Sequence, residues 1–150
     1  MTTPTSTTLR LHADRTTLTD GAAPELVIGV GVDDIAGPLF RHDPPTAIEI
    51  ERAIDRVEDA LGASGARQGE RGELRVAYPP LLAALGLTAD GMCLTRDEVE
   101  ARFERLATAA LGQPGALAGM PVDRAGAAAL LILRECMHHL GYSGVRRAQA

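Results

Sequence analysis

The densest group of reactive side chains in this 150-residue sequence is RECMHH, residues 134–139. Glu135 and His138 are three residues apart, so on a helix they share one face, as the ligands of carboxylate-bridged di-metal sites do. Such sites need a second Glu-x-x-His motif, and the sequence has none. The favoured alternative is structural. In the last turn of a helix the carbonyl end of the dipole stabilises His138 and His139, and Arg134 pairs with Glu135 or a facing acid.

A second group of polar side chains, Arg41, His42 and Asp43, precedes two prolines. Thr46 and Glu49 form a capping-box pattern, so a helix is expected to begin there. Exposed amides and the dipole at a helix N-terminus favour an anion, which makes this loop a candidate phosphate or carboxylate site. The alternative is that Arg41 and Asp43 pair on the surface while His42 packs against the loop.

Two adjacent carboxylates, Asp33 and Asp34, follow the apolar run Leu26–Val30. Carboxylates are ligands for Mg²⁺. Together with the Glu135–His138 pair, Asp33 and Asp34 are therefore the candidate metal ligands. The favoured alternative is that Asp33 or Asp34 caps a short helical turn over Ile35–Phe40. The glycines before them complete neither a dinucleotide fingerprint nor a phosphate loop, and the sequence implies no particular cofactor.

Leu26–Ile35, LVIGVGVDDI, resembles the glycine-alternating opening of holo-acyl-carrier-protein synthases. Phe103–Gly112, FERLATAALG, is similar to the helix that supplies a metal-binding glutamate in that family. The resemblance implies Mg²⁺ bound by Asp33 and Glu104. It is confined to these two ten-residue stretches and lacks the lysine that the family has after the helix phenylalanine, so the chain is not assigned to that family.

Composition excludes several classes of partner. The net charge is −5, every basic residue is Arg, and aromatic residues make up 3% of the chain. Nucleic-acid binding is therefore not expected, since it depends on dense positive charge or on aromatic stacking platforms. The N-terminus lacks signal-peptide features and no apolar stretch is long enough to span a bilayer, so we expect no membrane association and a cytoplasmic location. Abundant Ala and Gly with Arg in place of Lys are typical of GC-rich bacterial genomes.

The sequence pattern predicts one α+β domain over residues 1–150, whose helices and strands would position the candidate site residues. A short N-terminal antiparallel meander is expected to pack against three longer helices, of which the C-terminal helix is central. Capping boxes at Thr46 and Thr95 and glycines at the helix ends mark the helices. The predicted strands are 8–12, 15–19 and 26–30, and the predicted longer helices are 46–61, 95–111 and 122–140. Residues 73–78 are expected to return to a strand, and a short helix is expected over 79–85. Residues 1–7 are expected to be disordered and 63–72 to form a mobile loop.

The central helix shapes the functional hypotheses. Residues 125–129 are all small and residues 130–133 are apolar on every side, so this helix is buried within one domain or across a dimer seam. The leading hypothesis is a small accessory or interaction protein, homodimeric and without assigned catalysis. The alternative is an enzyme or binding protein for an anionic small molecule that bears phosphate or carboxylate, with an optional divalent metal. Its ligand site would combine Arg41, His42, Asp43, Arg134, Glu135, His138 and His139.

Overall fold

The chain has the α+β class that the sequence predicts. The computed structural model describes residues 6–21 and 23–149, in which six strands form one sheet of order β3-β2-β1-β4-β6-β5. The strands are β1 (Thr7–Leu11), β2 (Thr16–Thr19), β3 (Leu26–Ile28), β4 (Arg71–Val76), β5 (Cys93–Thr95) and β6 (Tyr142–Arg147). β1, β2 and β3 form an antiparallel meander, β4 and β6 continue the sheet parallel to β1, and β5 closes the far edge antiparallel to β6.

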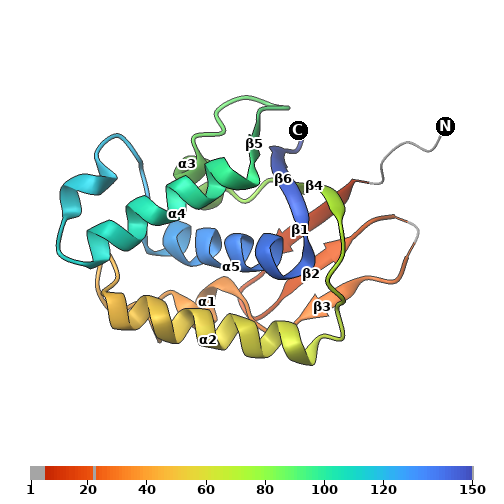
Figure 1. The fold of residues 1–150 in the computed structure, drawn as a ribbon, viewed down its shortest axis with the longest axis horizontal. Helices are drawn as coiled ribbons and strands as arrows, with labels where there is room; N and C mark the ends of the chain where they lie inside the picture. The colour runs from red at the N-terminus through yellow and green to blue at the C-terminus, as the bar shows by residue number, and fades with distance from the viewer. Residues whose placement is uncertain (1–5, 22, 150) are drawn as a thin grey trace.

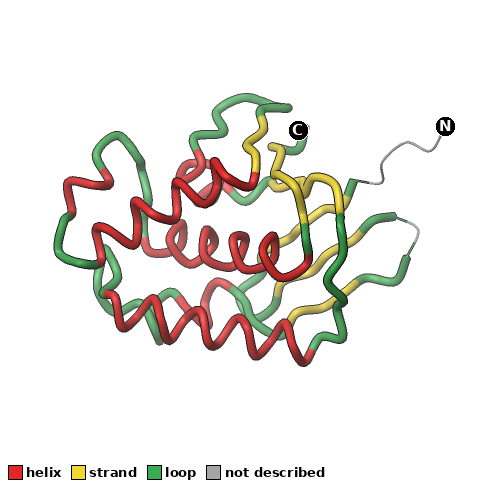
Figure 2. The backbone as a smooth tube through the Cα atoms, in the orientation of Figure 1, coloured by secondary structure: helices red, strands yellow, loops and turns green. Residues whose placement is uncertain are grey.

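The helices gather on one side of this sheet, as Figures 1 and 2 show. They are α1 (Val32–Ile35), α2 (Ala47–Ala63), α3 (Pro79–Leu85), α4 (Arg96–Ala110), the 3₁₀ helix η1 (Pro114–Leu117) and α5 (Arg124–Leu140). The connections from β1 to β4 and from β4 to β6 both step the same way across the sheet. Since such crossovers are right-handed in nearly all proteins, both sets of helices fall on the same face. No helix in the described residues is long and apolar enough to cross a membrane.

Three sequence-based boundaries need correction. The sheet is not confined to the N-terminal meander, because β4, β5 and β6 extend it to six strands. The loop expected over 63–72 ends earlier, since Arg71 and Gly72 belong to β4 and the Arg71 amide donates to the Gly141 carbonyl at 2.9 Å. Of the segment 1–7, residues 1–5 lie outside the described residues, and Thr7 is the first residue of β1.

Helix α5 is the centre of the fold, since twelve of its seventeen residues are buried. It contacts α1, α2, α3, α4 and β6 (Figure 1). The small residues at its start allow close packing: a Cβ on Gly126 would lie 2.9 Å from the Pro80 carbonyl oxygen. The small residues at the start of α5 thus pack against other helices of the same chain. They no longer give a reason to expect a dimer through this helix, and the oligomeric state stays a prediction.

Gly141 ends α5 and leads directly into β6. Its φ of 84° lies in the left-handed region, where residues with a Cβ are strained. The Gly69 backbone also occupies the space that a Cβ on Gly141 would need. Gly112, just after α4, has a φ of 100°, but a Cβ added there would meet open space. A substitution at Gly112 would therefore cause backbone strain alone, whereas one at Gly141 would cause both strain and steric overlap.

We predict that Gly141→Ala destabilises the protein far more than Gly112→Ala. The control substitution adds only left-handed strain, about 1 kcal/mol. Gly141→Ala adds overlap with the Gly69 backbone and should lower the free energy of unfolding by at least about 3 kcal/mol. Urea unfolding followed by circular dichroism measures both. Equal losses in the two variants would mean that the 69–71 segment does not pack on the end of α5 as described.

Candidate functional site

A cleft of about 800 Å³ lies at the carboxyl ends of the parallel strands β1, β4 and β6. In open sheets with parallel strands, ligands bind outside this edge. The end of β1, the turn after β4 and the last residues of β6 line the cleft. Its lining residues are 8–12, 75–79, Gly91 and 146–149.

The charged side chains that line this cleft are arginines, with His12 beside them. Arg10, His12, Arg75, Arg146 and Arg147 line it, and the described lining residues include no carboxylate. Arg10 and Arg75 are exposed, and their side chains have no ion pair or hydrogen bond within the described part of the chain. Two guanidinium groups therefore face solvent in a concave site without a protein partner.

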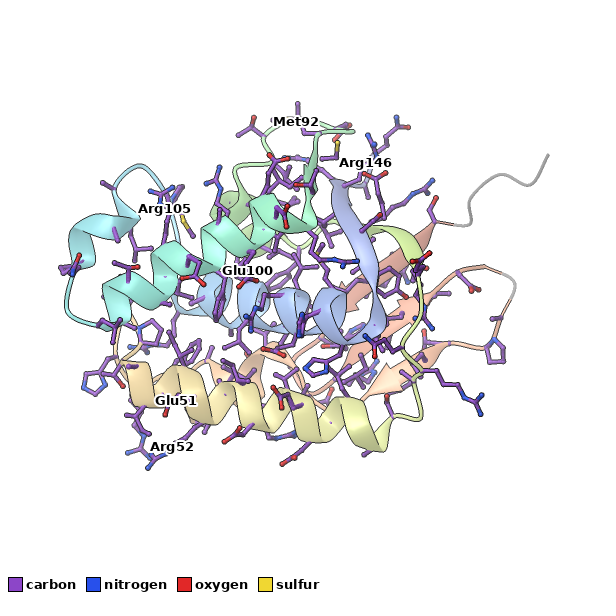
Figure 3. The ribbon with its side chains drawn as sticks, viewed as in Figure 1. Glu51, Arg52, Met92, Glu100, Arg105 and Arg146 are labelled. Carbon is purple, nitrogen blue, oxygen red and sulfur yellow. The ribbon has the colours of Figure 1, made fainter. Side chains whose placement is uncertain are left out.

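The other two arginines of the cleft are held in place by the protein. The Arg146 Nε donates to Glu73 Oε1 at 3.1 Å, and its Nη1 donates to the Gly91 carbonyl. The Arg147 Nη1 donates to the Leu87 carbonyl at 2.8 Å. Figure 3 shows Arg146 close to Met92, in the loop before β5. The Arg147 Nε also lies 3.5 Å from Asp90 Oδ1. Carboxylates therefore compensate the charges of Arg146 and Arg147, while Arg10 and Arg75 have no such partner among the described residues.

Strand register places the arginines on one face of the sheet. Arg75 pairs laterally with Thr8 of β1 and with Arg146 of β6, so their side chains project to the same side. Arg10 lies two residues beyond Thr8 and shares that face. The opposite face carries Leu9, Leu74 and Val145, which are buried under the helices. Neighbouring strands are about 4.8 Å apart, so the sheet itself sets the spacing of these cations.

Tyr78 lines the same cleft in the turn between β4 and α3. Partial burial raises the pKa of its phenol, and the charges of Asp33 and Asp123 raise that pKa further. The hydroxyl therefore stays protonated at neutral pH and is available as a hydrogen-bond donor.

The loop with Arg41, His42 and Asp43 is organised by Glu49, a buried carboxylate in the first turn of α2. Glu49 accepts hydrogen bonds from the backbone amides of Arg41 (3.2 Å) and His42 (3.4 Å), and the His42 Nδ1 lies 2.9 Å from its Oε2. The capping box with Thr46 forms as predicted. The helix N-terminus that seemed suited to an external anion thus holds the chain's own carboxylate. An Arg41–Asp43 ion pair is not among the contacts of the described residues.

Hydrogen bonding controls the ionisation of Glu49. Burial alone would raise its pKa, but the bonds from Thr46, His42 and Arg41 outweigh burial and lower the pKa from 4.5 to about 2. The carboxylate is therefore charged throughout the physiological range.

The two predicted ligand segments do not meet. The Arg41 carbonyl accepts a hydrogen bond from Arg124 Nη2 at 3.3 Å, and Arg124 is the first residue of α5. Arg134 is ten residues further along that helix, which is about 15 Å at 1.5 Å per residue. Residues 41–46 and 134–139 therefore lie at opposite ends of α5.

The 134–139 group forms a network of its own. The Arg134 guanidinium binds both oxygens of Glu100 at 2.9 and 3.0 Å and Glu135 Oε1 at 2.8 Å. Glu135 is 1% exposed and pairs with His139, one turn later, at 3.0 Å. His138 instead turns toward α4, where it lines a cavity of about 250 Å³ with Arg134 and Glu100. The histidine that contacts Glu135 is thus His139, and not His138 as the sequence spacing suggested.

Cys136 is not positioned for nucleophilic chemistry. Its side chain is fully buried, and burial, with a smaller effect from Glu135, raises the pKa of the thiol to about 12. Cys93 and Cys136 are both free thiols.

Asp34 has a structural role near the predicted position. Its Oδ2 accepts a hydrogen bond from the Gly31 amide at 2.8 Å and closes the first turn of α1. The helical turn is Val32–Ile35, earlier than the predicted 35–40. In the described part of the chain, neither Asp33 nor Asp34 nor Glu104 belongs to a group of three side chains arranged to hold a metal ion.

The basic cleft was missed by the sequence analysis. Its arginines lie on three strands that are far apart in the sequence, and β6 was not predicted. The available signal was the outward position of Arg10 and Arg75 on strands whose alternate residues are apolar, together with the Arg146-Arg147 pair. Without the parallel pairing, these residues could not be placed together.

The fold is shared with a group of phosphatase-like structures. The chain superimposes on the Ppx/GppA enzyme of Aquifex aeolicus with a TM-score of 0.70 and 14% identity, covering 96% of this chain and 53% of that one. An exopolyphosphatase-like protein matches with a TM-score of 0.69 and 11% identity, covering 98% of this chain and 55% of that one. The chain thus spans about half the length of these structures. No family model and no curated protein sequence matches it.

We predict that Glu49→Gln destabilises the protein in a pH-dependent way. Because folding lowers the pKa of Glu49, its contribution is fully present above pH 4.5 and is lost as the pH falls toward 2. The shift corresponds to about 3 kcal/mol at pH 7. Urea unfolding at pH 7 and at pH 3 should show a smaller difference between the two proteins at pH 3. A difference that does not change with pH would contradict this account of the loop.

Proposed function

We propose that this chain binds a small molecule bearing phosphate groups in the basic cleft at the carboxyl ends of β1, β4 and β6. The observation that carries this proposal is the pair of unpartnered guanidinium groups, Arg10 and Arg75, in a concave site with no carboxylate among its described lining residues. Uncompensated positive charge on one cleft attracts anions and raises their local concentration.

The chemistry of the site favours phosphate over a single carboxylate. Guanidinium groups bind phosphate oxygens with two parallel hydrogen bonds, and several of them here are spaced by the strands. A ligand with two or more phosphate groups would engage Arg10 and Arg75 together, and the Tyr78 hydroxyl would supply a further donor. The fold-level likeness to Ppx/GppA and exopolyphosphatase-like proteins supports the same class of ligand.

Binding is the function that the geometry supports best. A second candidate is an enzyme that hydrolyses the bound phosphate compound. Hydrolysis would need a general base within reach of the ligand. Among the described lining residues, His12 is the side chain of suitable chemistry. We therefore propose His12 for that role if turnover is observed.

The accessory homodimer predicted from the sequence is not favoured by a specific observation. In the described residues the large exposed apolar side chains come from four separate segments of the chain. They are Val27 on β3, Ile48 on α2, Met92 before β5 and Leu111 after α4.

We predict that inorganic tripolyphosphate binds the protein and that Arg10→Gln and Arg75→Gln each weaken binding about tenfold or more. Removing a charged hydrogen-bond donor costs about 1.5–3 kcal/mol, and 1.4 kcal/mol is a tenfold change in affinity. Isothermal titration calorimetry at fixed ionic strength measures the affinities.

The matched control is Arg52→Gln, an exposed arginine on α2 that Figure 3 shows at the opposite side of the molecule from Arg146. It removes the same charge outside the cleft and should leave the affinity unchanged. Absence of binding, or equal weakening in all three variants, would overturn the proposed site.

A further inference from the structure

Three side chains with metal-binding atoms converge where α2 packs against α5. Glu58 comes from α2, and Glu135 and His139 lie one turn apart on α5. One oxygen of each carboxylate and a nitrogen of the imidazole all lie within 4.8 Å of one another. The His139 Nε2 is 3.0 Å from Glu135 Oε2 and 3.7 Å from Glu58 Oε1. Among the described residues, this is the only such trio.

Two of the three spacings in this trio are close to the edge of a tetrahedral zinc site. Zinc binds histidine nitrogen and carboxylate oxygen at about 2.0–2.2 Å, so two ligand atoms on one tetrahedral ion are about 3.3 Å apart. The two distances from His139 lie on either side of that value. These two spacings are compatible with a shared ion after small side-chain movements.

The charges around the trio also favour a divalent cation. Among the described residues, Arg134 is the one arginine in contact with the trio, and it is shared by Glu100 and Glu135. Counting the acidic and guanidinium groups alone, the three carboxylates of Glu58, Glu100 and Glu135 and the one guanidinium of Arg134 leave a local formal charge of −2. Two positive charges on an ion would compensate it within a partly buried region.

Arg134 further prepares Glu135 as a ligand. It holds Oε1 of this buried carboxylate, which leaves Oε2 directed at His139. Hydrogen bonds of this kind orient metal ligands in protein sites. Glu58 is half-exposed and His139 is partly exposed, so an ion and a fourth, water ligand can reach the position from solvent.

We propose that Glu58, Glu135 and His139 form a binding site for a divalent metal ion of the zinc type. The site differs from the Glu135–His138 pair considered from the sequence, because its second helix contributes Glu58 and its imidazole is His139. It is independent of the phosphate proposal, since none of its ligands lines the basic cleft. The competing explanation is that the three groups form only ion pairs and hydrogen bonds.

The test uses the full, tag-free chain freed of metal with a chelator. Zinc affinity is measured by isothermal titration calorimetry, and Co²⁺ is added as a spectroscopic probe because its visible absorption reports tetrahedral coordination. Glu58→Gln and His139→Gln each remove one ligand at a partly exposed position, so both variants should fold. Circular dichroism checks that they do.

Two control substitutions match the ligand variants. Glu51→Gln removes an exposed glutamate from the same helix α2. His42→Gln removes a histidine that also lies 2.9 Å from a buried glutamate, Glu49, but outside any three-ligand group of the described residues.

We expect one zinc ion per chain and a tetrahedral Co²⁺ spectrum, with affinity reduced at least tenfold in Glu58→Gln and His139→Gln and unchanged in both controls. Absence of zinc binding to the parent chain would overturn the proposal. So would binding that the ligand variants retain, because the ion would then be held elsewhere.

Discussion

Burial of α5 on nearly all sides is the constraint from which the rest of the architecture follows. An apolar helix of this length must be covered by protein, and here the sheet lies on one side while α2, α3 and α4 surround the remainder. Because all the helices are used on that side, the opposite face of the sheet carries polar and charged residues. The carboxyl edge of the parallel strands is left open as a basic cleft.

The N-terminus of α2 and the basic cleft are both favourable for negative charge, but they differ in whether the protein already fills them. At the N-terminus of α2 the favourable position for negative charge is filled by Glu49, which already accepts hydrogen bonds from the Arg41–His42 segment. In the cleft, Arg10 and Arg75 have no such partner within the described residues. We therefore place the proposed ligand site at the unpaired arginines of the cleft and not at the helix terminus.

Local signals in the sequence predicted the parts of the fold that depend on neighbouring residues. The capping boxes at Thr46 and Thr95 mark the starts of α2 and α4. β6 was missed because YSGVRR contains a glycine and two arginines, and its strand conformation depends on pairing with β4, some seventy residues earlier in the chain. Glu135 illustrates the same limit: His138 and His139 are both about one turn away, and tertiary packing distinguishes them. His138 faces α4 and Glu100, whereas His139 faces Glu135 and Glu58.

The most direct test of the central claim is to locate a bound phosphate compound by nuclear magnetic resonance. Amide resonances of the isotope-labelled chain are followed while tripolyphosphate is added. The account predicts shifts concentrated at the ends of the parallel strands, at His12, Ala77 and Ala148, with little change in residues 41–46. Shifts centred on residues 41–46, or none at saturating ligand, would contradict it.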